Sequence, residues 1–169
     1  EQGVKFATSS AAHSFGTGDY TVEFWMYTTA ASDNRYCFSI SLAGAIGTVA
    51  DACMWLRPNQ STGVLEFTSY AGGASVDLNV SSAGSKILVG QWQHIAVAPK
   101  SGTLRMFIDG ALVASGASPG SLNYSASMVV QVGTWSQSSS SGIYIDEVRV
   151  TKGEAYYFAD FTPPAAAFT

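Results

Sequence analysis

Short apolar runs, many of them alternating with polar residues, extend along the whole chain of 169 residues and are separated by Gly, Ser and Asn. A period of two is typical of β-strands, and no segment keeps the 3.6-residue period of an amphipathic helix over three turns. The pattern predicts eleven strands, at residues 3–7, 20–28, 36–41, 52–58, 64–71, 75–81, 92–99, 103–109, 111–116, 127–135 and 143–151.

The number and spacing of these segments predict an all-β fold. Eleven strands in one domain require two sheets or a closed barrel. Regular spacing with tight turns favours a two-sheet antiparallel sandwich with jelly-roll connections. We expect one domain over residues 1–157 and a C-terminal tail over residues 158–169, because Pro163 and Pro164 remove two backbone donors that a strand would need.

The segment LRMFIDGALVASG, residues 104–116, carries the strongest hairpin signal in the chain. Asp-Gly between two apolar runs is typical of a two-residue turn with positive φ angles. Pairing across this turn places Phe107 opposite Leu112 on one face and Met106 opposite Val113 on the other. Both faces are apolar there, so the pattern predicts a sheet that is covered on both sides, with Asp109 as a turn former.

Charge excludes two classes of partner. Only 12% of the residues are charged and the formal net charge is −4, so the chain has no basic surface to neutralise phosphates. Nucleic acids and anionic membrane surfaces are therefore not expected partners. No apolar run approaches the ~20 residues that span a bilayer, and we expect a soluble chain.

The two cysteines, Cys37 and Cys53, are too few for a metal cluster. If the intervening segment turns around Ala45, the two flanking strands pair so that the thiols lie opposite each other. The sequence leaves two alternatives open, a disulfide or two small buried thiols, because a disulfide also needs suitable geometry and oxidising conditions.

An acidic residue interrupts the apolar positions of IYIDEVRVT, residues 143–151. Strict alternation places Asp146 on the face of Val148 and Val150, with Glu147 on the opposite face. A carboxylate on a buried face must be hydrogen-bonded, paired or metal-bound. Two interpretations have equal weight: a calcium ligand, or an acid that accepts backbone N–H groups.

No catalytic constellation is visible in the sequence. His94 has no nucleophile motif beside it, and the chain has no G-x-S-x-G segment, so His94 is interpreted as structural. Glu23 is alone on its strand, and Asp146 and Glu147 face opposite ways under strict alternation. Glycoside hydrolysis requires two acids at a defined separation in one cleft, so we predict that the protein is not an enzyme.

Aromatic residues make up 12% of the chain and provide candidate binding residues. Rings at strand ends or in loops can stack on sugars, with Asn, Asp and Ser nearby as hydrogen-bond partners. Trp135 is the first candidate because it precedes the Ser-rich segment 136–142, which we expect to be a mobile surface loop. The other candidates for ligand binding are Trp55, Tyr70 and Tyr124, and Tyr36 lies in the same kind of position.

Three segments together resemble the laminin-G-like, concanavalin A-like lectin/glucanase superfamily. They are GDYTVEFWMYTT, GQWQHIAVAPKSGTLRMFIDGALVASG and YIDEVRVTKGEAYYFADFTPP, and the resemblance covers residues 4–164. It implies a jelly roll of two curved sheets, with recognition on the concave face or its rim. Glucanases of this fold carry an E-x-D-x-E cluster that VEFWMYT and RMFIDGA lack, and relatives with a structural calcium have an Asp ligand at the position that matches Asp146.

The ending ADFTPP looks most like modules of tailed-phage structural proteins. The resemblance therefore implies a non-catalytic binding or decoration module of a virion, in contact with cell-surface glycans or with neighbouring virion proteins. The alternative is a carbohydrate-binding module of a secreted bacterial protein, and a glycan hydrolase is the third possibility. Calcium is the expected structural ion.

Overall fold

The computed structural model describes residues 4–6, 15–29, 36–42, 52–59, 62–71, 75–118, 120, 122, 128–133, 142–166 and 168. The strands of this part of the chain are β1 (Val4–Phe6), β2 (Tyr20–Thr28), β3 (Phe38–Leu42), β4 (Ala52–Pro58), β5 (Val64–Ala71), β6 (Ser75–Lys86), β7 (Trp92–Val97), β8 (Thr103–Ile108), β9 (Ala111–Ala117), β10 (Met128–Val132) and β11 (Ile143–Lys152). Each corresponds to a strand that the apolar pattern predicts. Among these residues, no helix is long and apolar enough to cross a membrane.

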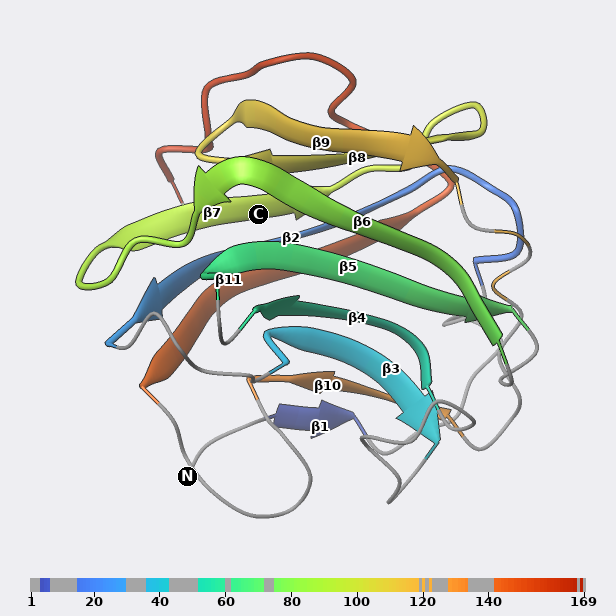
Figure 1. The fold of residues 1–169 in the computed structure, drawn as a ribbon, viewed down its shortest axis with the longest axis horizontal. Coiled ribbons are helices and arrows are strands. Elements are labelled where there is room, and N and C mark those ends of the chain that lie inside the picture. Colours follow the sequence, from blue (N-terminus) through green and yellow to red (C-terminus); the bar gives the residue numbers. More distant parts are fainter. Residues whose placement is uncertain are drawn as a thin grey trace.

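The strands form two antiparallel sheets that pack face to face (Figure 1). One has six strands in the order β1-β10-β3-β4-β5-β6, and the other has five in the order β11-β2-β7-β8-β9. Neighbours far apart in sequence, such as β1 with β10 and β2 with β11, are paired, as expected of a jelly roll. The prediction of an all-β, two-sheet antiparallel jelly-roll sandwich is confirmed.

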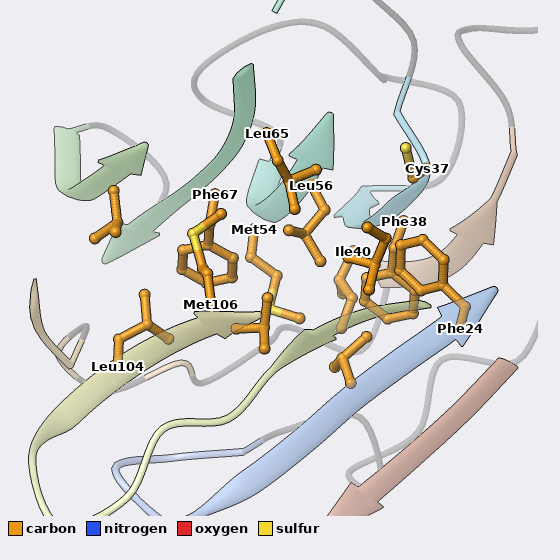
Figure 2. Packing of buried hydrophobic residues seen from close by; sticks show 14 of the residues in the cluster. Phe24, Cys37, Phe38, Ile40, Met54, Leu56, Leu65, Phe67, Leu104 and Met106 are labelled. Carbon is orange, nitrogen blue, oxygen red and sulfur yellow. The ribbon is translucent and has the colours of Figure 1, made fainter. Parts of the chain in front are cut away.

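The core lies between the two sheets, where alternate residues of each strand meet (Figure 2). Phe24 of β2 and Met106 of β8 extend from the five-stranded sheet toward Phe38, Met54 and Phe67 of the six-stranded sheet. These side chains are fully buried. Burying each one contributes about 1.5 to 3 kcal/mol, so this apolar layer holds the two sheets together.

The Asp109-Gly110 turn joins β8 to β9, as the sequence predicts. Asp109 has a φ of 52° and Gly110 a φ of 79°, and Phe107 pairs with Leu112. One prediction here is wrong, because a bulge after Met106 pairs that residue with Ala114 instead of Val113. Both faces of β8 are covered as expected, because Met106 packs into the core and Phe107 packs under the C-terminal segment.

The register of β3 with β4 differs from the sequence prediction. Ile40 pairs with Met54, whereas a turn centred on Ala45 would pair it with Ala50. In this register Cys37 does not face Cys53, and Cys37 carries a thiol that donates to Sδ of Met26 at 3.1 Å. The two registers differ by four residues, which keeps every side chain on the same face, so the apolar pattern could not distinguish them.

We predict that Gly110→Ala destabilises the fold by at least about 3 kcal/mol, because it strains the turn and displaces the C-terminal segment. A Cβ on Gly110 would lie 1.9 Å from the carbonyl oxygen of Phe161. Gly102→Ala is the matched control, since Gly102 has a similar φ of 77° but open space around it. It should cost only about 1 to 2 kcal/mol in urea unfolding, and equal losses for the two variants would contradict the prediction.

Candidate functional site

The chain after β11 lies on the outer face of the five-stranded sheet, the face opposite the core. It adds no strand among the residues described there, as the two prolines predict. The Phe161 N–H donates to the carbonyl oxygen of Gly110 at 2.9 Å, and Asp160 accepts the Leu112 N–H at 2.9 Å. A second apolar cluster forms between the sheet and the segment. The sheet side contributes Ala96, Ala98 and Phe107, and the segment contributes Ala155, Tyr157 and Phe161.

A buried carboxylate binds this segment to the sheet. Glu23 of β2 is fully buried, and its Oε2 lies 3.1 Å from Nε2 of His94 on β7. The hydroxyl of Tyr157 donates to the same oxygen at 2.7 Å, and Nε of Arg149 on β11 donates to Oε1 at 2.8 Å. The other ring nitrogen of His94 has no hydrogen-bond partner among the described residues, which places the ring proton on Nε2. Glu23 therefore joins three strands and the C-terminal segment.

The protonation states follow from this geometry. Burial raises the pKa of Glu23, but hydrogen bonds from His94, Tyr157 and Arg149, with the charge of Arg149, outweigh it and hold the pKa below its usual range. Burial and the hydrogen bond to Glu23 both raise the pKa of Tyr157. Glu23 is thus ionised and Tyr157 protonated at neutral pH. With both oxygens of Glu23 occupied and no solvent access, this network is structural.

We predict that Glu23→Gln lowers the free energy of unfolding at pH 7 by about 3 kcal/mol, because it leaves buried partners without a charge to bind. The folded pKa lies below the unfolded value of about 4.3, so the Glu23 contribution is present above that pH and is lost as the pH falls through the folded pKa.

Urea unfolding at pH 3 and pH 7 measures both effects. The stability difference between wild type and Glu23→Gln should shrink at pH 3. Glu154→Gln, at an exposed position beside the same face, is the control and should leave the stability at pH 7 unchanged. A Glu23→Gln difference that is the same at both pH values would refute the role of the Glu23 charge.

An open cleft of about 570 Å³ lies beside this network, between the sheet and the C-terminal segment. Trp25 of β2, Trp92 of β7 and the pair Asp146 and Glu147 of β11 line it from the sheet, and residues 163–166 form the opposite wall. Trp92 is 47% exposed. The cleft therefore combines large apolar rings with two carboxylates.

A β-bulge in β11 brings the two acids together. Asp146 pairs with Trp25 and Arg149 pairs with Glu23, so β11 has one residue more than β2 over this interval. Glu147 takes the extra position with a φ of 51°. Two expectations are corrected: Asp146 is exposed and shares its face with Arg149 instead of Val150, and Asp146 and Glu147 line the same cleft although they are neighbours.

Both carboxylates keep acceptor capacity. Asp146 accepts the N–H of Glu147 through Oδ1 at 2.9 Å, and Glu147 accepts the N–H of Phe168 through Oε2 at 2.8 Å. Neither makes another side-chain hydrogen bond within the described residues. Both come from the β11 side, and the wall formed by residues 163–166 carries no acid. The described lining thus offers acceptors that suit hydroxyl groups, but among the described residues it does not place two carboxylates on either side of a bond.

An aromatic row continues from the cleft across three strands, and strand pairing sets its order. Tyr27 of β2 pairs with Trp92 of β7 on one side and with Tyr144 of β11 on the other. The ring centroids of Tyr27 and Trp92 are 5.7 Å apart, and those of Tyr27 and Tyr144 are 5.9 Å apart. Tyr144 is 59% exposed. Sequence reasoning missed this row, although Trp25 and Tyr27 alternate with core residues of β2 and so mark a second apolar face.

Two of the aromatic residues predicted to bind a ligand, Trp55 and Tyr70, lie in the other sheet. Trp55 and Tyr70 meet with Tyr36 in a separate cluster of the six-stranded sheet, with centroid distances of 5.1 Å and 4.9 Å to Trp55. Trp55 is 7% exposed and Tyr70 is 4% exposed, so neither ring has a free face. Trp135, Tyr124 and most of the Ser-rich segment lie outside the described residues. Ligand binding by these four residues stays a prediction.

Calcium binding at Asp146 also stays a prediction. The described residues contain no group of three or more His, Cys, Asp or Glu side chains that could hold a metal ion, and Asp146 has one oxygen occupied by a backbone N–H. Calcium takes six to eight oxygen ligands, and the described side chains supply two carboxylates at this position. The described side chains alone therefore fit a calcium ion poorly.

If calcium binds here, EDTA lowers the melting temperature, because an ion held only by the native state stabilises it by mass action. Asp146→Asn then removes this dependence on calcium. Differential scanning calorimetry with EDTA and with added CaCl₂ makes the measurement. A melting temperature that EDTA does not change would exclude a structural calcium ion.

A family model matches residues 2–154, and its description is "Concanavalin A-like lectin/glucanases superfamily". No curated protein has a significantly similar sequence. The match covers both sheets and ends shortly after β11.

Solved structures with a similar fold include an arabinanase domain, a galectin and a carbohydrate-binding module. Domain 4 of an extracellular arabinanase from Geobacillus stearothermophilus, in complex with arabinotriose, has a TM-score of 0.62 and 20% identity over 90% of this chain and 68% of its own. The galectin LEC-6 from Caenorhabditis elegans has a TM-score of 0.54 and 15% identity over 89% and 91% of the two chains. The carbohydrate-binding module CBM66 from Bacillus subtilis has a TM-score of 0.51 and 13% identity over 90% and 83%. At these identities the likeness concerns the fold.

Proposed function

The chain belongs to the concanavalin A-like lectin/glucanase superfamily, and we propose that it is a non-catalytic module that binds uncharged glycans in the cleft of the five-stranded sheet. The exposed ring of Trp92, beside Trp25 and two carboxylates with free acceptor capacity, is the observation that carries this proposal. The proteins that share this fold include a galectin, a carbohydrate-binding module, and an arabinanase domain whose structure was solved in complex with arabinotriose. Their similarity supports a role in sugar binding.

The chemistry of a sugar fits this lining. A sugar ring has an apolar face of C–H groups, which packs on an aromatic ring, and an edge of hydroxyl groups, which donate hydrogen bonds. Trp92 and Trp25 offer the rings, and Asp146 and Glu147 offer acceptors on the adjacent strand. Hydrogen bonds to a charged acceptor are about twice as strong as neutral ones, so these acids orient the sugar.

The same acids select against anionic sugars. The cleft lining contains two carboxylates and no Lys, Arg or His among the described residues. Arg149 is nearby, but its guanidinium is bound to Glu23. A uronate or sulfate group in the cleft would therefore meet like charge without compensation. The lining therefore favours uncharged glycans over anionic ones.

The biological setting rests on the sequence resemblance alone. A module of a phage virion, with a virion protein as a second kind of partner, is the setting that the C-terminal segment suggests, and a secreted bacterial protein is the alternative. Both settings place a glycan-binding module outside the cell. Hydrolysis is the competing activity, and a bound oligosaccharide that keeps its length during prolonged incubation would exclude it.

We expect Trp92→Ala to weaken binding to neutral oligosaccharides at least about tenfold on a glycan array and in calorimetric titration, because it removes a stacking surface. The melting temperature should change little, since Trp92 is half exposed. Phe158→Ala is the matched control: Phe158 is 59% exposed, lies against Lys100 and does not line the cleft. Equal binding by wild type and Trp92→Ala would refute the proposed site.

A further inference from the structure

We infer that the site takes a single polysaccharide chain that runs across the strands from Trp92 over Tyr27 to Tyr144, with at least three consecutive sugar residues in contact. This inference rests on the proposed function and specifies the form of its ligand. It assigns Tyr144, at the edge of the sheet, to the outermost sugar position.

The spacing of the three rings supports a chain rather than one sugar. The two centroid steps, 5.7 Å and 5.9 Å, are similar to the length of one sugar residue in an extended chain. They arise because the rings stand at paired positions of neighbouring strands, and strands are about 4.8 Å apart. A chain that crosses the strands therefore meets a new ring with each residue.

The tilt of the rings indicates a single chain rather than a crystalline surface. The planes of Tyr27 and Trp92 are inclined by 52°, and those of Tyr27 and Tyr144 by 68°. A flat crystalline polysaccharide needs coplanar rings to contact all three at once. A single chain can rotate about its glycosidic bonds, and successive residues can then follow the turn from ring to ring.

Of the three rings in the row, only Trp92 is among the described residues that line the cleft. Residues 163–166 stand opposite Trp25 and Trp92, whereas Tyr27 and Tyr144 lie outside the cleft lining. Beyond Tyr144 the described part of the five-stranded sheet has no further strand, because β11 is its edge. The Trp92 end thus holds one sugar most closely. Tyr144 is 59% exposed, so among the described residues nothing requires the chain to end there.

Neutral oligosaccharides of one to five residues from several series, including arabinan, xylan, cellulose and galactan fragments, test this inference by calorimetric titration. For the series that binds, the affinity should rise up to at least three residues, by roughly three- to tenfold with the third. Tyr144→Ala should remove that last increase and leave binding of the shorter fragments unchanged. Tyr144→Phe, which keeps the ring, should retain the increase.

The outcomes separate this inference from the proposed function. An affinity that stops rising at one or two residues, or that rises equally in Tyr144→Ala, overturns the three-ring site but leaves the cleft as a glycan site. Retention of the protein on microcrystalline cellulose or crystalline chitin, with no competition by soluble chains, overturns it as well. If no neutral oligosaccharide of any length binds, the proposed function fails and this inference fails with it.

Discussion

The buried carboxylate of Glu23 anchors the C-terminal segment to the sheet, and the cleft depends on that segment. An isolated buried carboxylate would cost several kcal/mol, and here His94, Arg149 and Tyr157 offset that cost with hydrogen bonds from three different elements. Only Tyr157 belongs to the segment. Its hydroxyl therefore gives the segment a polar anchor at a defined point on this face.

From this anchor the segment is held at successive points. The ring of Tyr157 stacks on Phe161, with centroids 3.6 Å apart, and Phe161 bonds to the Asp109-Gly110 turn. The prolines that follow cannot donate to a strand, so the chain stands beside the sheet and forms one wall of the cleft. The opposite wall needs a second irregularity, the bulge at Glu147, which turns two neighbouring acids toward one space.

The sequence predicts the strands and the Asp109-Gly110 turn well because the signals are local: alternation, apolar runs and turn residues. The sequence does not predict the register between paired strands, because that register depends on long-range contacts. A four-residue shift in the pairing of β3 with β4 keeps every face the same, so the pattern of apolar residues could not exclude the register that faces Cys37 with Cys53. The sequence gives no sign of the bulge in β11 either. Glu147 adopts the left-handed conformation there, whereas Gly or Asn is the usual sequence signal for a positive φ.

The candidate site was hidden for a related reason. Loops and strand ends are where binding residues usually lie, and that expectation led to Trp55, Tyr70, Tyr124 and Trp135. Trp25 instead lies in the middle of a strand, on a face whose cover is an irregular segment with no periodicity to reveal it. The segment covers this face around Glu23 and leaves it open around Trp92. The sequence pattern alone does not show where that boundary lies.

The indole N–H resonances of the four tryptophans show directly whether a sugar binds beside Trp25 and Trp92, because each resonance reports on one side chain in the folded protein. Titration of isotopically labelled protein with a neutral oligosaccharide that it binds should shift the signals of Trp25 and Trp92 and leave that of the buried Trp55 unchanged. Shifts confined to Trp55 or Trp135, with Trp25 and Trp92 unaffected, would place recognition elsewhere and contradict the account.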